Sequence, residues 1–217
     1  MANFSDFYFD SSTGKNRIYV RQWSPEGEPR GIVQIEHGIA EHIERYDDFA
    51  RFLADNGFIV VGDDHLGHGK SIDNGGEQGF FAESDGWDYV VWDIDRLHDI
   101  MHEKYPDLPY IFFGHSMGSF LVRTYIIRHP EKPDAVIISG TGHQPLVLGG
   151  LAMASAAVKL YGAHKIGDTL NSVAFGSYNK GYANPRTDFD WLSRDTENVD
   201  KYIADPLCGF VPTVSLF

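Results

Sequence analysis

Residues 110–128 read YIFFGHSMGSFLVRTYIIR, and this stretch decides the fold. An apolar run leads into a G-x-S-x-G turn, and a helical pattern follows from Ser119 to Arg128. The turn consists of Gly114, His115, Ser116, Met117 and Gly118. A buried strand, this turn and a helix are the context of a nucleophile elbow, in which the serine hydroxyl emerges at the carboxyl edge of a parallel sheet. Because the two glycines let strand and helix approach without Cβ clashes, the stretch predicts a tight turn with Ser116 as nucleophile.

An oxyanion formed at this serine needs two backbone N–H donors. The first is expected from Met117, the residue after the nucleophile, where the start of a helix also favours negative charge. The second is expected from the loop of residues 37–42, which reads His-Gly-Ile-Ala-Glu-His. Its His-Gly step lets the backbone turn so that the N–H of Ile39 points into the site. The other residues expected to support this loop are His37 and Gly38, and for the side chains of His37 and His42 we favour a hydrogen-bonding role in the scaffold.

Short β-rich runs alternate with helical patterns over the first 140 residues. The expected strands are residues 17–23, 31–36, 58–61, 110–113 and 135–139, and the expected helices are residues 46–56, 87–104 and 119–128. Several of these strands are continuously apolar, which is typical of a parallel sheet covered on both faces. We therefore expect an α/β fold with a mostly parallel central sheet and helices on both faces.

The character of the sequence changes after Gly140. Residues 141–205 contain no comparable β run and read as helices and loops, so we expect a helical cap over the carboxyl edge of the sheet. The chain then divides into a core of residues 1–140, a cap of residues 141–205 and the start of a return to the core in residues 206–217. The apolar region 144–160 is interpreted either as a wall of an acyl-chain channel or as a packed cap helix.

Composition and charge narrow the choice of partners. The 217 residues include 31 acidic and 18 basic ones, for a formal charge of −13. This excess argues against nucleic acid and against docking on an anionic membrane through basic residues, and otherwise indicates solubility. The partner expected from the serine motif is a small-molecule acyl ester substrate. Neither a signal-peptide pattern nor an apolar stretch of roughly 20 residues is visible, so we expect a cytoplasmic protein without an integral membrane segment. The single cysteine, Cys208, is expected to be a buried packing residue; the oligomeric state is left open.

The sequence DDHLGHGKS at residues 63–71 raises a metal site as an alternative, because it holds two Asp and two His residues. Its glycines and its position after a strand favour a turn that shapes the floor of the pocket instead. We therefore expect no metal and no other cofactor.

Three motifs in this order and spacing resemble the monoacylglycerol lipase and lysophospholipase branch of the α/β-hydrolases, also called the serine aminopeptidase S33-like group. The matching stretches are residues 37–42 with Arg45 and Tyr46, residues 64–71, residues 114–119 and, at the end of the expected cap, residues 205–207. The resemblance covers nearly the whole chain. It implies a serine esterase or lipase that acts on a fatty-acyl ester of glycerol or on a lysophospholipid, needs no cofactor, and holds the oxyanion with the amides of Ile39 and Met117.

The triad of that group follows the order Ser, Asp, His, with the Asp and the His after two further core strands. Behind the nucleophile the sequence holds only three histidines, His129, His143 and His164. His129 ends the helix that leaves the turn, and His164 falls in the cap, so His143 is the one candidate for a substitute base. We expect the triad Asp and His to lie outside these 217 residues, after further core strands. Without those strands, the strand at residues 135–139 is an exposed edge of the sheet.

Two other functions stay open. A peptidase or amidase can use the same fold, and an amino-terminal substrate would need nearby carboxylates, for which the candidates are Glu41, Asp188, Asp190 and Asp195. A binding module would keep the pocket without a working triad. A full-length gene that supplies the missing Asp and His would eliminate the binding module.

Overall fold

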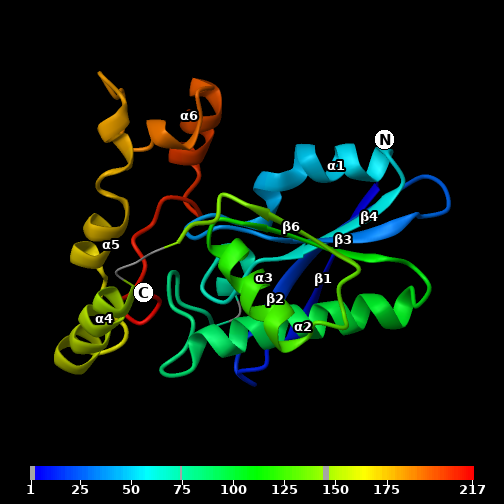
Figure 1. Cartoon of the computed structure of the whole chain (residues 1–217), viewed down its shortest axis with the longest axis horizontal. Helices are drawn as coiled ribbons and strands as arrows, with labels where there is room; N and C mark the ends of the chain where they lie inside the picture. The colour runs from blue at the N-terminus through cyan, green and yellow to red at the C-terminus, as the bar shows by residue number, and fades with distance from the viewer. Residues whose placement is uncertain (1–2, 74, 144–146) are drawn as a thin grey trace.

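A computed structural model describes residues 3–73, 75–143 and 147–217 of the chain. Its centre is a six-stranded sheet with the strand order β1-β2-β4-β3-β5-β6 (Figure 1). The strands are β1 (Asn3–Asp10), β2 (Arg17–Ser24), β3 (Gly31–Glu36), β4 (Phe58–Asp63), β5 (Tyr110–His115) and β6 (Ala135–Ser139). The last four run parallel, whereas β1 and β2 are antiparallel to their neighbours. The expected mostly parallel α/β sheet is confirmed.

Helices cover both faces of this sheet, which is why all six residues of β3 are buried. The three helices are α1 (Asp47–Asp55), α2 (Gly86–Lys104) and α3 (Met117–Arg128), and their ends lie within two residues of the expected ones. On one face, Ala50 of α1 packs with Trp23 of β2. On the other face, Ile94 of α2 and Leu121 of α3 belong to the larger core cluster. Two short 3₁₀ helices, η1 (Ile43–Tyr46) and η2 (Gly69–Ile72), lie in the loops that follow β3 and β4.

Strand β1 was not expected from the sequence. It pairs with β2 along its whole length, from Asn3 opposite Ser24 to Asp10 opposite Arg17. Phe7, Tyr8 and Phe9 follow one another, so the alternation of polar and apolar residues that indicates a strand is hidden. The strand forms an edge of the sheet, and most of its residues are exposed or half-buried.

The described part of residues 141–205 contains helices and loops and no strand, as expected from the sequence. Its elements are α4 (Val147–Tyr161), α5 (Asp168–Phe175), η3 (Tyr178–Gly181), η4 (Asp190–Leu192) and α6 (Thr196–Ala204). They lie beyond the carboxyl ends of the parallel strands (Figure 1). The chain then returns toward the core, where Gly209 donates a hydrogen bond to the backbone of Ala40 and Thr213 donates one to Gly79.

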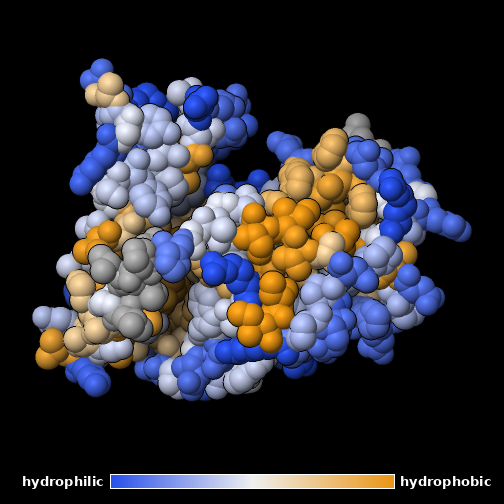
Figure 2. All heavy atoms as spheres, viewed as in Figure 1, coloured by the Kyte–Doolittle hydropathy of each residue, from blue (hydrophilic) through white to orange (hydrophobic). Residues whose placement is uncertain are grey.

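Strand β6 forms the second edge of the described sheet, because it pairs with β5 alone. The side chain of Ile137 is 50% exposed there. Figure 2 shows apolar residues gathered over the strand that Figure 1 labels β6. The exposed edge expected at residues 135–139 is thus present. No helix in the described residues is long and apolar enough to cross a membrane.

Candidate active site

Ser116 stands at the junction of β5 and α3 in a conformation that serine rarely adopts. Its φ is 52° and its ψ is −118°. The cost of such a backbone, about 1–3 kcal/mol, persists only where the surroundings hold it. Here the Ser116 N–H donates to Ser139 O in β6 (3.0 Å), and the Ser119 N–H and hydroxyl donate to Ser116 O (3.0 and 2.5 Å). The turn is therefore strained and fixed from both sides.

The glycines around Ser116 allow approaches that no side chain would permit. A Cβ on Gly114 would lie 2.6 Å from the carbonyl oxygen of Gly118, which is the close approach of strand and helix expected from the sequence. A Cβ on Gly38 would lie 3.1 Å from Cβ of Ser116 and 2.6 Å from Oε1 of Glu41. The loop of residues 37–42 is therefore packed directly against the serine.

Two backbone N–H groups near the serine are unpaired within the described part of the chain, those of Ile39 and Met117. The amides on either side of Ile39 have partners. The Gly38 N–H donates to Oε1 of Glu41 (2.6 Å), and the Ala40 N–H donates to Nε2 of His68 (3.3 Å). The two amides expected to hold an oxyanion are thus without an acceptor among the described residues.

The histidines of the loop are tied into the scaffold. His37 Nδ1–H donates to Gly38 O (2.7 Å), while its Nε2 accepts the His65 N–H (3.1 Å). Burial, together with His65 and His68 nearby, lowers the pKa of His37 well below its usual range. Nε2 of His42 lies 2.8 Å from Oδ2 of Asp205. Neither ring forms a hydrogen bond with the Ser116 hydroxyl among the described residues.

The motif at residues 63–71 supports the same loops. The carboxylate of Asp64 accepts the N–H groups of Ile43 (2.8 Å) and Lys70 (2.7 Å), so it joins the turn after β4 to the turn after β3. His65 Nδ1 lies 3.0 Å from Oδ2 of Asp63. Asp63 and His65 of the motif therefore pair with each other, whereas Asp64 holds the backbone of the two turns.

A buried acid beneath the serine was missed in the sequence. Glu36 is fully buried, and its Oε2 lies 3.8 Å from Nε2 of His65. Burial and the Asp63 carboxylate raise the pKa of Glu36 to about 8. Burial opposes a charge on His65, but the carboxylates of Asp63, Glu36 and Asp64 outweigh it and raise its pKa to about 9. The available signal was a glutamate at the end of a strand that is apolar but for one glutamine, Gly-Ile-Val-Gln-Ile-Glu.

Ser116 opens into a cavity of about 270 Å³, which we call the serine cavity. Its polar wall consists of Glu41, Arg45 and Tyr46, and its other side is formed by Trp191 and Tyr202 with further residues. Arg45 pairs with Oε2 of Glu41, and the Tyr46 hydroxyl donates to Oε1 (2.8 Å). Both carboxylate oxygens of Glu41 are therefore engaged.

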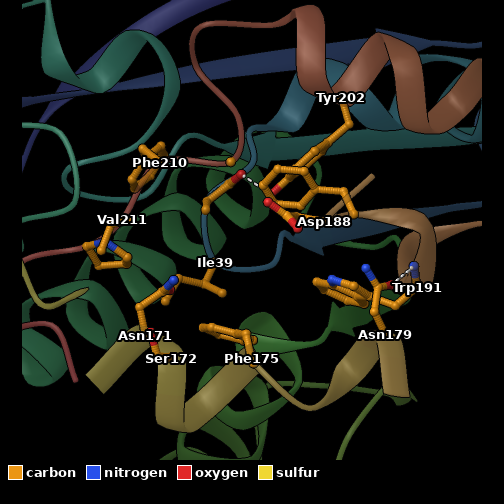
Figure 3. Close-up of a pocket in the computed structure, with 15 residues that line it drawn as sticks. Ile39, Asn171, Ser172, Phe175, Asn179, Asp188, Trp191, Tyr202, Phe210 and Val211 are labelled. Carbon is orange, nitrogen blue, oxygen red and sulfur yellow. Dashed lines mark hydrogen bonds between the residues drawn. The ribbon is translucent and has the colours of Figure 1, made fainter. Parts of the chain in front are cut away.

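A larger cavity of about 340 Å³, which we call the cap cavity, adjoins the serine cavity but does not include Ser116 (Figure 3). The residues common to both are Ile39, Phe175, Trp191 and Tyr202. The further lining of the cap cavity is mixed: it includes the apolar side chains of Phe189, Phe210, Val211 and Pro212 and the polar ones of Asn171, Ser172, Asn179 and Asp188. Residues 149–161 of α4 line neither cavity, and residues 144–146 of the expected acyl-channel region lie outside the described residues.

The acidic residues considered for an amino-terminal substrate are dispersed. Glu41 lines the serine cavity and Asp188 lines the cap cavity. Asp190 and Asp195 line neither cavity. Asp190 accepts the Thr187 hydroxyl (2.6 Å), and Asp195 caps α6 by accepting the Glu197 N–H (3.0 Å).

No histidine forms a hydrogen bond with the Ser116 hydroxyl in residues 3–73, 75–143 and 147–217. His115 Nδ1 lies 3.2 Å from the Ser139 hydroxyl. His129 packs on Tyr125 at the far end of α3, and His164 bonds to two glutamates on the surface. His143 is exposed and lines neither cavity. The described residues thus place Ser116 near the amides of Ile39 and Met117, with no histidine hydrogen-bonded to the serine.

A family model described as serine aminopeptidase, S33, matches residues 27–217. The chain is 34% identical over 200 residues to a monoacylglycerol lipase of Mycolicibacterium smegmatis, covering 91% of this chain and 63% of that protein. It is 30% identical over 190 residues to the monoglyceride lipase of Mus musculus, covering 88% of this chain and 56% of that protein. It therefore spans roughly three fifths of the length of these curated relatives. A thermostable carboxyl esterase from Bacillus coagulans, solved in complex with glycerol, superposes with a TM-score of 0.91 at 31% identity, over 99% of this chain and 70% of that one.

Proposed function

Because the chain belongs to the serine aminopeptidase S33 family of α/β-hydrolases, we propose that it is a serine carboxylic ester hydrolase. Its substrates in this proposal are fatty-acyl esters, namely monoacylglycerols or lysophospholipids. The observation that carries the proposal is the placement of the strained Ser116 in a cavity, beside the two unpaired amides of Ile39 and Met117. Relatives named as monoacylglycerol lipases support the same substrate class.

In the proposed reaction, the Ser116 hydroxyl oxygen attacks the acyl carbon of the ester and passes its proton to a general base. The carbonyl oxygen becomes an oxyanion, which accepts hydrogen bonds from the N–H groups of Ile39 and Met117. The tetrahedral intermediate expels the alcohol, which takes up the proton, and leaves an acyl-enzyme on Ser116. Water then attacks this ester by the same route and releases the fatty acid. The hydrogen bonds that keep the strained Ser116 backbone in its conformation also hold the nucleophile in place through both steps.

We place the general base outside the 217 residues. The Ser116 hydroxyl has no hydrogen-bond partner among the described residues, and a serine without a base is a weak nucleophile near neutral pH. A histidine oriented by an acid, added beyond this sequence, would complete the order Ser, Asp, His. The open edge of β6, next to the strand that carries Ser116, supports this assignment.

The two cavities suggest where the two parts of such a substrate bind. The alcohol part of the ester fits the serine cavity, where Glu41, Arg45 and Tyr46 offer hydrogen-bonding groups. The acyl chain fits the cap cavity, whose lining includes Phe175, Phe189, Phe210, Val211 and Pro212. Glycerol in the Bacillus coagulans esterase supports a glycerol head group. We also propose that residues 141–205 act as the cap that forms these walls, since residues of α5 and η4 line both cavities.

A peptidase is less well supported by the same geometry. An ammonium group would need an unengaged carboxylate beside Ser116. Both oxygens of Glu41 already accept hydrogen bonds, and Asp190 and Asp195 face other partners. The fourth candidate, Asp188, lines the cap cavity and not the serine cavity.

We propose a cytoplasmic location for the protein. The single cysteine, Cys208, is buried, as expected of a packing residue. It forms no disulfide within the 217 residues, which fits a reducing compartment. Fractionation of cells that express the tagged protein from its own gene tests this location.

The substrate proposal is tested by turnover. The 217-residue chain and the longest product of its gene are each supplied with a monoacylglycerol, a lysophosphatidylcholine and an aminoacyl p-nitroanilide. Release of fatty acid by the longer product, lost in Ser116→Ala, is the expected result. Cleavage of the anilide alone would support a peptidase, and binding of lipid without turnover by either form would support a binding module.

A further inference from the structure

Tyr202, on α6, contacts the loop that carries Ile39. Its hydroxyl donates a hydrogen bond to the carbonyl oxygen of Ala40 (2.9 Å), and the Gly209 N–H donates to the same oxygen (2.9 Å). Figure 3 shows the Tyr202 side chain reaching this loop from the far side of the cavity. The carbonyl of the residue after Ile39 is therefore held by two donors from the C-terminal part of the chain.

The hydrogen bonds to the Ala40 carbonyl matter because the backbone of Ala40 is strained. Its φ is 55°, in the left-handed region that costs a residue with a Cβ roughly 1 kcal/mol. The Ala40 N–H is fixed as well, by Nε2 of His68 (3.3 Å). Bonds on both sides thus hold Ala40 in a conformation that it would otherwise leave.

The chemical state of both partners suits this role over a wide pH range. Burial and the nearby thiol of Cys208 raise the pKa of Tyr202 above its usual range, so its hydroxyl keeps the proton that it donates. Burial lowers the pKa of His68 to about 3. The neutral ring donates from Nδ1 to Leu66 O (2.9 Å), which leaves the Nε2 lone pair to accept the Ala40 N–H.

The peptide groups around Ile39 are consequently all fixed. The Gly38 N–H is held by Glu41 (2.6 Å) and the Gly38 carbonyl by His37 (2.7 Å) on one side, and Ala40 is held through its N–H and its carbonyl on the other. The Ile39 N–H itself has no acceptor among the described residues. Its direction depends on the bonds that hold its neighbours.

We propose that Tyr202 is a positioning residue that keeps the Ile39 amide aimed at the oxyanion, by holding the Ala40 carbonyl from α6. The proposal rests on the proposed function for its catalytic consequence, whereas the clamp itself is a property of the loop. It links residues that lie 162 positions apart in the sequence. The ring of Tyr202 also lines both cavities, so the same side chain borders the substrate and sets the loop.

The clamp is tested first by hydrogen exchange in the 217-residue chain. Tyr202→Phe removes the hydroxyl and keeps the ring. Tyr182→Phe is the matched control, because that residue lies in the same region, is 42% exposed and lines neither cavity. We expect amide exchange across residues 38–42 to become at least about tenfold faster in Tyr202→Phe and to stay unchanged in Tyr182→Phe. Unchanged exchange in both variants would overturn the clamp.

The catalytic consequence is tested in whichever form of the protein reacts with a fluorophosphonate. A loosened oxyanion donor affects the transition state more than the bound substrate, so we expect kcat for a monoacylglycerol to fall about tenfold while KM changes less than about twofold. A purely structural role would raise KM and lower thermal stability together. If kcat in Tyr202→Phe equals that of Tyr182→Phe, the positioning role is wrong.

A second variant approaches the loop from its other side. His68→Phe removes the acceptor of the Ala40 N–H and keeps an aromatic ring among Phe81 and Phe210. The same rise in exchange across residues 38–42 is expected there, even if Tyr202→Phe does not fold. If no form of the protein reacts with the probe, the proposed function fails, while the exchange experiment still decides on the clamp.

Discussion

Gly118 lies so close to Glu36 that a Cβ at residue 118 would stand 2.0 Å from the Glu36 carbonyl oxygen. The first turn of α3 is therefore packed on the end of β3 at the backbone, directly beneath Ser116. This approach places the serine and the loop of residues 37–42 side by side, since the loop begins where β3 ends.

Gly118→Ala tests that approach. The added methyl group meets backbone atoms that cannot move aside, so we expect the free energy of unfolding to fall by about 3 kcal/mol or more. Urea unfolding measures the change. Gly150→Ala is the control, because Gly150 lies in α4 with nothing within 4 Å of an added Cβ. That variant is expected to be as stable as the parent or up to about 1 kcal/mol more stable, and equal effects at both positions would contradict the account.

Replacement of Ser116 tests the strain in the elbow. Glycine adopts a φ near 52° without the penalty that a Cβ brings, although it also loses more entropy on folding. We therefore expect Ser116→Gly to be more stable than Ser116→Ala by about 1 kcal/mol. Chemical unfolding of the two variants measures the difference. A glycine variant less stable than the alanine variant would show that the turn is not strained.

The buried acid Glu36 makes stability depend on pH. Its pKa is raised to about 8 in the folded protein, from an ordinary value of 4.5, so the folded state holds this proton where the unfolded chain has lost it. Stability is therefore expected to fall as the pH rises from about 5 to 8, by up to about 1.4 kcal/mol per pH unit for one proton. His65, with a pKa raised to about 9, adds a loss of the same sign between about 6.5 and 9.

Glu36→Gln isolates the glutamate from the histidine. The amide cannot ionise, so the variant is expected to gain stability relative to the parent as the pH rises from 5 to 8. Thermal unfolding over this range, in buffers with matched heats of ionisation, measures the gain. An unchanged difference between the two proteins across the range would contradict a raised pKa for Glu36.

The cap cavity is expected to set the length of acyl chain that the protein accepts. Val211→Trp fills space in this cavity, so hydrolysis of long-chain p-nitrophenyl esters should fall at least about tenfold relative to the butyrate ester. Val173→Trp is the control, because that side chain is 67% exposed on α5 and lines neither cavity. The same chain-length profile in both variants would show that the cap cavity does not set the accepted chain length.

The elbow and the sheet could be predicted from the sequence because their signals are local. The run from Tyr110 to Gly118 combines strand, turn and helix start in neighbouring residues, and the buried parallel strands are largely apolar. Strand β1 was missed because three aromatic residues in a row hide its alternation.

The contacts that complete the candidate site could not be predicted, because they depend on tertiary packing. Tyr202 and Ala40 are 162 positions apart, and nothing in either neighbourhood indicates their hydrogen bond. The division of the space above Ser116 into two cavities likewise depends on how α5 and η4 settle over the sheet. That Glu36 lies next to His65 could not be predicted either, because it depends on how β3 and β4 are aligned in the sheet.

The central claim is that Ser116 is a catalytic nucleophile completed by a base outside the 217 residues. Intact mass spectrometry after incubation with a fluorophosphonate tests it most directly, on this chain, on the longest product of the gene, and on Ser116→Ala of each. We expect one adduct on Ser116 of the longer product and none on the 217-residue chain. Adduct formation on the 217-residue chain would contradict the external base, and no adduct on either form would contradict the nucleophile itself.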